Sequence, residues 1–288
     1  MTACAADFKV KAMIYAIHKI LRGRFAGHFK KKIPLLGLLF VAFFWFQAAP
    51  LQADGPQPPF GPGEKLTFRL KWTVFNAGEA VLEVLPNEMI GGREARHFVM
   101  RAKSNAFIDS FYKVREQIDA YTDLAMTRSV LYKKRQIEGK ANRDVVVTFD
   151  WQNFKAQFIM FGDKYPPVAI PPGTFDPLSV FYYSRLLQWD VDREISCPIT
   201  DGEKFVIGRA RIIKRETIKV AGRSYDTFLI EPDLQHIGGV FEKSKDAKIE
   251  LWVTADHRHI PVKIKSKVVV GSFIGELISD LAPHPPRQ

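Results

Sequence analysis

The sequence predicts an all-β protein, an antiparallel curved sheet that closes into a partial β-barrel and carries one or two short helices. After residue 63, apolar and polar residues alternate with a period of two in about a dozen short stretches, which is the pattern of strands with one buried face. Gly, Asn and Pro separate these stretches at short spacing. Short strands joined by tight turns are typical of antiparallel sandwiches and barrels.

The first strand is predicted at 66–72, where Leu66, Phe68, Leu70 and Trp72 alternate with polar residues. A turn at 76–78 leads into the return strand at 80–85. The later predicted strands lie at 96–101, 128–137, 145–150, 154–161, 204–206, 210–220, 224–231, 248–254, 262–270 and 272–281, with hairpin turns at 150–153 and 221–224.

One stretch breaks this pattern and predicts a helix over 177–189. Asp176 stands at the N-cap position and Pro177 at the first helical position, which together form a good helix start. Apolar residues follow at helical spacing. A weaker helical candidate covers 105–112, where Phe107 and Phe111 lie four residues apart.

The composition excludes several classes of protein. Of 288 residues, 47% are hydrophobic, which is too many for a disordered chain. The 19 Gly and 18 Pro follow no period, so the chain is not collagen-like. Two cysteines cannot supply a disulfide framework or a four-thiolate zinc site. Cys197 has apolar neighbours, and we expect it to be a buried thiol.

Most of the formal net charge of +11 belongs to the first 53 residues, which hold eight Lys and Arg against Asp7 alone. The remaining residues hold 34 basic and 30 acidic side chains. Phosphate binding needs a concentrated basic face. The mildly basic remainder therefore gives no support to a nucleic-acid partner.

Residues 1–53 are predicted to be a signal peptide with a long basic n-region. Lys30–Lys32 is followed by 21 uncharged residues, 33–53, which begin with an apolar run and end in small and helix-breaking residues; this is the order of a secretory signal. Cleavage is predicted after Ala53. Because 33–53 is also long enough to span a bilayer, an inner-membrane anchor is the alternative. Both readings place the rest of the chain in the periplasm or outer envelope.

The exported part is divided into three. Residues 54–63 are rich in Pro and Gly and are expected to form an extended arm. Residues 64–282 show no internal boundary and are predicted to form a single β-barrel-like domain. Residues 283–288 are a short tail.

Several short motifs recur in an order that resembles a known family. They are Gly63-Glu64-Lys65-Leu66-Thr67-Phe68, Trp72 with Ala77-Gly78, Thr148-Phe149-Asp150, Asp176-Pro177-Leu178-Ser179 with Tyr183 and Arg185, and Leu251-Trp252-Val253 with Asp256, Arg258 and Ile260-Pro261-Val262. This order is similar to the Domain of unknown function 3108 family of bacterial exported proteins, over nearly all of 60–282. The resemblance implies an envelope location and a β-rich fold, and no activity. By analogy of fold alone, the domain is similar to the half-open barrels of periplasmic lipoprotein carriers.

No catalytic residue, metal site or cofactor is predicted. His257 and His259 lie beside Asp256, but a metal site needs three or four convergent ligands, and the further ligands would be the distant His236 or His97. A turn between two strands is the preferred interpretation of this segment.

Other polar residues also have simpler roles than catalysis. Asp176 and Ser179 are explained by helix capping. The sequence contains no Gly-x-Ser-x-Gly elbow, and Gly238-Gly239 lacks the Lys-Ser pair of a phosphate-binding loop. Acid pairs such as Asp190/Asp192 and Asp109/Asp119 carry nothing that marks a general acid and base.

The aromatic residues near the two predicted helices suggest a lined apolar cavity. The predicted ligand-binding residues are Trp72, Phe107, Phe111, Tyr112, Phe181 and Trp189. The predicted function is therefore non-enzymatic: an exported protein that binds a lipid or lipid-like group, or an envelope partner, in a concave aromatic-lined sheet. The alternatives are an assembly factor that docks a partner through its sheet edges and a hydrolase of envelope polymers. The sequence leaves the ligand, the partner and the oligomeric state open.

Overall fold

The computed structural model describes residues 58–233, 248–268 and 271–282. The predicted signal peptide with Ala53, residues 54–57 of the 54–63 arm, His236 and the 283–288 tail lie outside these ranges. Within them, no helix is both long enough and apolar enough to cross a membrane.

The described chain forms one sheet of 15 strands and two short helices. The strands are β1 (Lys65–Trp72), β2 (Phe75–Ile90), β3 (Arg93–Ser104), β4 (Val114–Asp123), β5 (Ser129–Glu138), β6 (Ala141–Asp150), β7 (Lys155–Met160), β8 (Asp163–Lys164), β9 (Val168–Ala169), β10 (Glu194–Thr200), β11 (Phe205–Val220), β12 (Arg223–Pro232), β13 (Lys248–Thr254), β14 (Pro261–Val268) and β15 (Gly271–Leu281), and the helices are α2 (Ala106–Asp109) and α3 (Pro177–Ser184).

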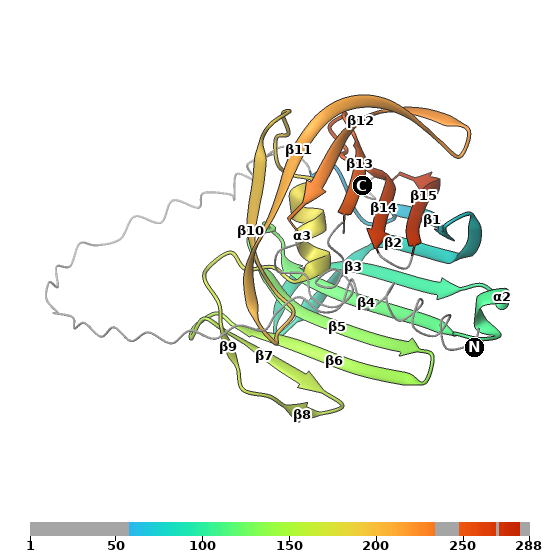
Figure 1. The fold of residues 1–288 in the computed structure, drawn as a ribbon. Helices are drawn as coiled ribbons and strands as arrows, with labels where there is room; N and C mark the ends of the chain where they lie inside the picture. The colour runs from blue at the N-terminus through green and yellow to red at the C-terminus, as the bar shows by residue number, and fades with distance from the viewer. Residues whose placement is uncertain (1–57, 234–247, 269–270, 283–288) are drawn as a thin grey trace, which may run out of the picture.

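Every pair of neighbouring strands in this sheet is antiparallel, and the order runs β10-β11-β12-β13-β14-β15-β1-β2-β3-β4-β5-β6-β7-β8, with β9 paired to β7. β1 therefore lies between β15 and β2, so the first and last strands join the two halves. The sheet curves around α3, which stands between those halves (Figure 1). Its two ends do not pair with each other. The predicted all-β fold, a partial barrel with short helices, is confirmed.

A single row of side chains across β2–β7 forms the floor of the main core. The register pairs these strands so that one residue from each lies in line: Val84, Phe98, Ala120, Tyr132, Val147 and Phe158. All six are buried. Tyr182 of α3 stacks on Phe98 with ring centroids 4.1 Å apart. The concave face of the sheet is therefore filled by α3 and its aromatic side chains.

The start of α3 follows from its local sequence, and its end does not. Asp176 accepts hydrogen bonds from the backbone N–H groups of Leu178 and Ser179 at 2.9 and 2.8 Å, as an N-cap residue does. The predicted helix over 177–189 is too long, since α3 ends at Ser184. Beyond it, Leu187 donates to the Ser184 carbonyl in a tighter turn. Between Ser184 and residue 189, tertiary contacts of Arg185 and Trp189 take the place of the predicted last helical turns.

Other predicted elements also differ in extent. The helical candidate at 105–112 contains only the short α2, which Asn105 caps through Ile108 N–H. The strands predicted at 204–206 and 210–220 are the single long β11. Phe60, which the sequence placed in the 54–63 arm, is 2% exposed and packs edge-on against Phe98 and Tyr182. The end of the arm thus belongs to the core.

The sheet edges offer little free backbone. Part of β10 is covered, because Phe175 N–H donates to the Pro198 carbonyl at 3.0 Å and Thr200 N–H donates to the Phe175 carbonyl at 2.9 Å. At the other end, β8 and β9 have two residues each. Short or covered edges resist pairing with another chain.

The β10–β11 turn packs against β6 and β7 at Gly202. This residue has φ +89°, and a Cβ placed on it would lie 2.7 Å from Val147 Cγ2. We expect Gly202→Ala to lower the free energy of unfolding by about 2–3 kcal/mol, through backbone strain and overpacking together. Urea denaturation of the full chain measures this change.

Gly222→Ala is the matched control. Gly222 has φ +86°, but an added Cβ there would meet no atom within 4 Å, so only the backbone strain of about 1 kcal/mol remains. Equal losses in the two variants would show that the β10–β11 turn does not pack on β6.

Candidate functional site

The six predicted ligand-binding residues lie in two regions. Trp72 ends β1, while Phe107 of α2 and Phe111 just after it are exposed at the same end of the sheet. Tyr112 is buried behind them and donates to Glu138 at 3.0 Å. Phe181 packs on the core from α3. Trp189 is buried in a separate cluster with Phe228 and Ile230, so the six do not line one cavity.

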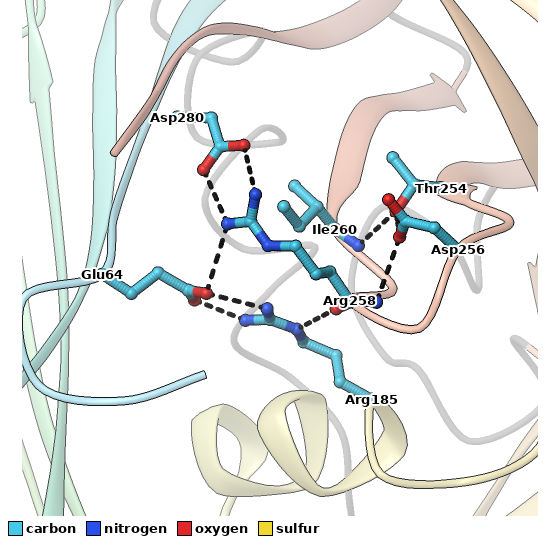
Figure 2. Close-up of polar contacts among 7 residues, drawn as sticks. All are labelled: Glu64, Arg185, Thr254, Asp256, Arg258, Ile260 and Asp280. Atoms are coloured by element: carbon cyan, nitrogen blue, oxygen red, sulfur yellow. Dashed lines mark hydrogen bonds and ion pairs between the residues drawn. The ribbon is translucent and has the colours of Figure 1, made fainter. Parts of the chain in front are cut away.

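A buried ionic cluster joins four distant segments (Figure 2). Arg185, just after α3, donates to both carboxylate oxygens of Glu64 at 2.6 and 3.0 Å. Arg258, in the β13–β14 turn, donates to both oxygens of Asp280 at 2.9 Å and lies 3.8 Å from Glu64. The side chains of Glu64 and Arg185 are 0% and 1% exposed. Two guanidinium groups thus balance two carboxylates.

The β13–β14 turn is shaped to hold this cluster. Asp256 accepts from the Thr254 hydroxyl at 2.7 Å and from Arg258 N–H at 3.0 Å, and the Arg258 carbonyl accepts from Arg185 Nε at 3.0 Å. Glu64, Arg185, Asp256 and Arg258 all belong to the motifs on which the family resemblance rests. Each charged group of the cluster has a partner within the protein. The cluster therefore links the strands to the segment that follows α3, and its charges are already paired without a ligand.

The two histidines of this turn point to different surroundings. His259 has φ +45°, stacks on Trp189 with ring centroids 4.4 Å apart, and its Nδ1 lies 3.1 Å from the Arg185 carbonyl. Burial lowers the pKa of His259. His257 is exposed. His97 instead lies 3.0 Å from Asp119 on β4. In the part of the chain that the structure describes, no group of three or more His, Cys, Asp or Glu side chains is arranged to hold a metal ion.

Two further buried groups, Cys197 and Asp176, are enclosed by the fold. Cys197 lies on β10, and burial raises the pKa of its thiol to about 11, so the reactive thiolate is scarce near neutral pH. Asp176 is fully enclosed between its capping bonds and the Ser129 hydroxyl, which donates to it at 2.5 Å. Burial raises the pKa of Asp176.

The face of β2–β6 that points away from α3 is hollowed. One row of this face runs in register through Val81, Arg101, Gln117, Arg135 and Asp144. Each of these residues is an odd number of positions from the core row on its own strand, so its side chain points to the opposite face. A hollow of about 660 Å³ lies over this row.

A second hollow of about 660 Å³ adjoins the first. The two share Arg135, Asp144 and Phe161 in their linings. We call the two together the outer-face groove. Its apolar lining includes Val81, Ile137, Val146, Ile159 and Phe161. Such volumes suit a small ligand. None of the six predicted ligand-binding residues is among the described residues that line the groove.

The charged side chains of the groove differ in how closely they are paired. Glu83 pairs with Lys65 at 2.9 Å and also accepts from Arg101. Arg135 is 80% exposed and only 3.8 Å from Asp144, a long contact that solvent screens. Phe161 and Ile137 are 58% and 41% exposed. An exposed cation beside exposed apolar side chains can bind a molecule that has both an acidic group and an apolar part.

These groove residues were not predicted from the sequence. A signal was present on β5, where Lys133, Arg135 and Ile137 alternate outward, because a large apolar residue in an outward series of charges is unusual. The convergence itself depends on the register of five strands, which the sequence does not display.

A curved, open antiparallel sheet packed on one helix defines a β-barrel-like protein. The chain belongs to the DUF3108 family, which is described as a protein of unknown function and whose model matches residues 67–278. The family resemblance found in the sequence is thus confirmed. No curated protein matches the chain in sequence.

Solved structures show a likeness in fold. The chain is similar to a β-barrel-like protein of domain of unknown function DUF1849 from Brucella abortus, with 10% identity, a TM-score of 0.50, and coverage of 78% of this chain and 99% of that chain. At this identity the likeness concerns the fold alone.

Two further structures are more distant. One, from Parabacteroides distasonis, is described as a candidate lipoprotein, with 12% identity, a TM-score of 0.28, and 77% and 98% of the two chains covered. The other, from Bacteroides fragilis, is described as a candidate exported protein with a YmcC-like fold, with 7% identity, a TM-score of 0.31, and 77% and 97% covered. These scores are too low to support an argument.

Proposed function

We propose that the protein is a non-enzymatic protein of the periplasm or outer envelope that binds a lipid-like, acidic amphiphile in the outer-face groove. The observation that carries this proposal is the pair of adjoining hollows on the face opposite α3, in which exposed apolar side chains stand beside Arg135. Because α3 and the core row pack on the concave face and both hollows lie on the face opposite it, the proposed binding place moves from the predicted concave lining to the outer face.

The geometry supports distinct roles for the two kinds of lining residue. Val81, Ile137 and Phe161 release water when an apolar chain covers them, which favours binding through the hydrophobic effect. Arg135 supplies a planar cation for a carboxylate or phosphate. The location outside the cytoplasm rests on the basic and apolar order of residues 30–53.

A role without chemistry is favoured by the state of the buried ionisable groups. Glu64 and Arg185 are bound to each other, and Lys134 and Glu116 form a second buried pair at 2.5 Å. Asp176 caps α3. These groups stabilise the fold, and the groove presents exposed charges of the kind that bind a ligand. The short and covered sheet edges speak against the alternative of partner docking by strand addition.

Binding of a dansyl-labelled fatty acid to the full chain, measured by fluorescence titration, tests this proposal. Phe161→Asn is expected to weaken binding about tenfold or more, because one buried aromatic side chain contributes roughly 1.5–3 kcal/mol. Asn tolerates the positive φ of +52° at this position. Arg135→Glu is expected to weaken binding of the fatty acid and to spare its uncharged methyl ester.

Phe154→Asn is the matched control. Phe154 flanks the other end of β7, has φ +50° and is 45% exposed, but it is not among the groove-lining residues. Its replacement removes an exposed Phe of the same kind and leaves the groove intact. Equal loss of binding in both Asn variants, or in neither, would contradict a site in the groove.

A further inference from the structure

Four apolar side chains are exposed together at one end of the sheet. Val74, Phe75, Phe107 and Phe111 are 76%, 62%, 68% and 45% exposed. Val74 belongs to the β1–β2 turn and Phe75 begins β2, while the other two belong to the connection that contains α2. Figure 1 places this turn and α2 at the same end of the molecule. We call these four residues the apolar tip.

Hydrogen bonds hold the two parts of the apolar tip together. Asn105, the N-cap of α2, donates through its backbone N–H to the Ala77 carbonyl at 2.9 Å and through its side chain to the Asn76 carbonyl at 2.6 Å. The acceptors Asn76 and Ala77 are the two residues that come after Phe75. The rings of Phe107 and Phe111 meet edge to face, with centroids 5.7 Å apart. The tip is thus one patch built from two segments.

The same segment also shows which side chains are reserved for the fold. Ile108 and Tyr112 point inward and are 3% and 2% exposed, whereas their neighbours Phe107 and Phe111 point outward. Ile108 and Tyr112 thus anchor a segment that exposes two Phe side chains to water. Such exposed apolar patches mark interaction sites.

Two lysines border the apolar tip. Lys113 follows Tyr112, and Lys140 lies in the β5–β6 turn; both are exposed. Gly139 N–H donates to the Lys113 carbonyl at 2.9 Å, which brings this turn against the α2 segment. Among the residues described, neither lysine forms an ion pair with a carboxylate, and Asp109 in α2 is bound by Arg115.

We propose that the apolar tip docks onto the surface of an anionic phospholipid bilayer. Phe75, Phe107 and Phe111 would enter the interfacial region, while Lys113 and Lys140 reach lipid phosphates. Apolar side chains on adjoining turns, flanked by lysines, match an interface that is apolar below and anionic above. Long lysine side chains suit that boundary. This docking goes beyond ligand binding in the groove and does not depend on it.

The depth of a spin label tests this proposal in the full chain. Residues 33–53 can themselves attract vesicles, so the measurement reports where the tip lies and not only whether protein binds. Cys4→Ser and Cys197→Ala remove the native thiols, and a nitroxide is attached through Val74→Cys. Power saturation is recorded without vesicles, with phosphatidylcholine vesicles, and with vesicles that also contain phosphatidylglycerol.

The expected result is that vesicles containing phosphatidylglycerol move the label at position 74 into an oxygen-rich, apolar environment. The matched control is Met89→Cys, a label site at the β2–β3 end that is 66% exposed, which is expected to stay in water. Phe107→Ser with Phe111→Ser is expected to reduce the immersed fraction about tenfold or more. Lys113→Glu with Lys140→Glu is expected to reduce it severalfold, and added salt to do the same to the wild type.

Three outcomes would overturn the proposal. One is a label at position 74 whose environment does not change when anionic vesicles are added. A second is equal immersion of the labels at 74 and 89. The third is immobilisation of the tip label without vesicles, together with a dimer in light scattering, which would assign the apolar tip to a second copy of the chain.

Discussion

Replacing Arg185 with Met is expected to lower the free energy of unfolding by about 3–5 kcal/mol. The substitution removes both hydrogen bonds that Arg185 donates to the Glu64 carboxylate. That buried carboxylate then keeps only Arg258, 3.8 Å away, as its partner. Breaking a buried ion pair by removing one partner costs this much because the remaining charge is uncompensated. Urea denaturation followed by circular dichroism measures the change.

Two further variants separate the loss of the pair from other effects. Adding Glu64→Gln to Arg185→Met removes the stranded charge and is expected to recover a large part of the lost stability. Arg215→Met breaks an exposed ion pair with Asp226 and is expected to change the unfolding midpoint little, since solvent screens such pairs. If Arg185→Met were as mild as Arg215→Met, the ionic cluster would not hold α3 to the sheet.

Phe98→Ala is expected to destabilise the protein by a similar amount, about 3–5 kcal/mol. Phe98 is 0% exposed and lies between Phe60 and the stacked ring of Tyr182. Its removal leaves a cavity where the arm, the sheet and α3 meet. The unfolding free energy in urea measures the effect.

The comparison for Phe98→Ala is Phe107→Ala. Phe107 is exposed in the apolar tip and contributes little to the folded core, so its loss is expected to change stability by less than about 0.5 kcal/mol. A large effect at Phe107, or a small one at Phe98, would mean that the filled core is not on the α3 face.

The groove and the apolar tip are neighbours in the fold. Arg115, which lines the groove, binds Asp109 of α2, and Ile137 and Asn142 line the groove close to the β5–β6 turn that carries Lys140. A tip docked on a membrane would therefore bring one end of the groove to the bilayer surface. The outer-face groove and the apolar tip would then serve one task, the exchange of an amphiphile with a membrane.

Local signals carried most of the fold prediction. The alternation at Leu66, Phe68 and Leu70 predicted β1, and Asp176 with Pro177 predicted the start of α3, because strand periodicity and helix capping depend on a few adjacent residues. The end of α3 could not be predicted in this way. It depends on Arg185 reaching Glu64, 121 residues away.

The candidate site was harder to predict for the same reason. Aromatic residues near a helix do not reveal which way each ring points: Tyr112 is buried, Phe111 beside it is exposed, and Phe181 packs on the core from α3. The groove arises from strand register, which brings Val81 and Arg135 into one row across β2–β5. A one-residue change of register would move every side chain of a strand to the other face.

Binding in the outer-face groove is tested most directly by locating a bound amphiphile on the full chain. A fatty acid that carries a diazirine is photolysed on the protein, and the modified residues are mapped by mass spectrometry. We predict adducts at the groove, in peptides that contain Ile137, Ile159 and Phe161, which disappear with an excess of unlabelled fatty acid. Adducts that concentrate instead on Phe98, Phe181 or Tyr182 would place the ligand on the α3 face and contradict its binding in the outer-face groove.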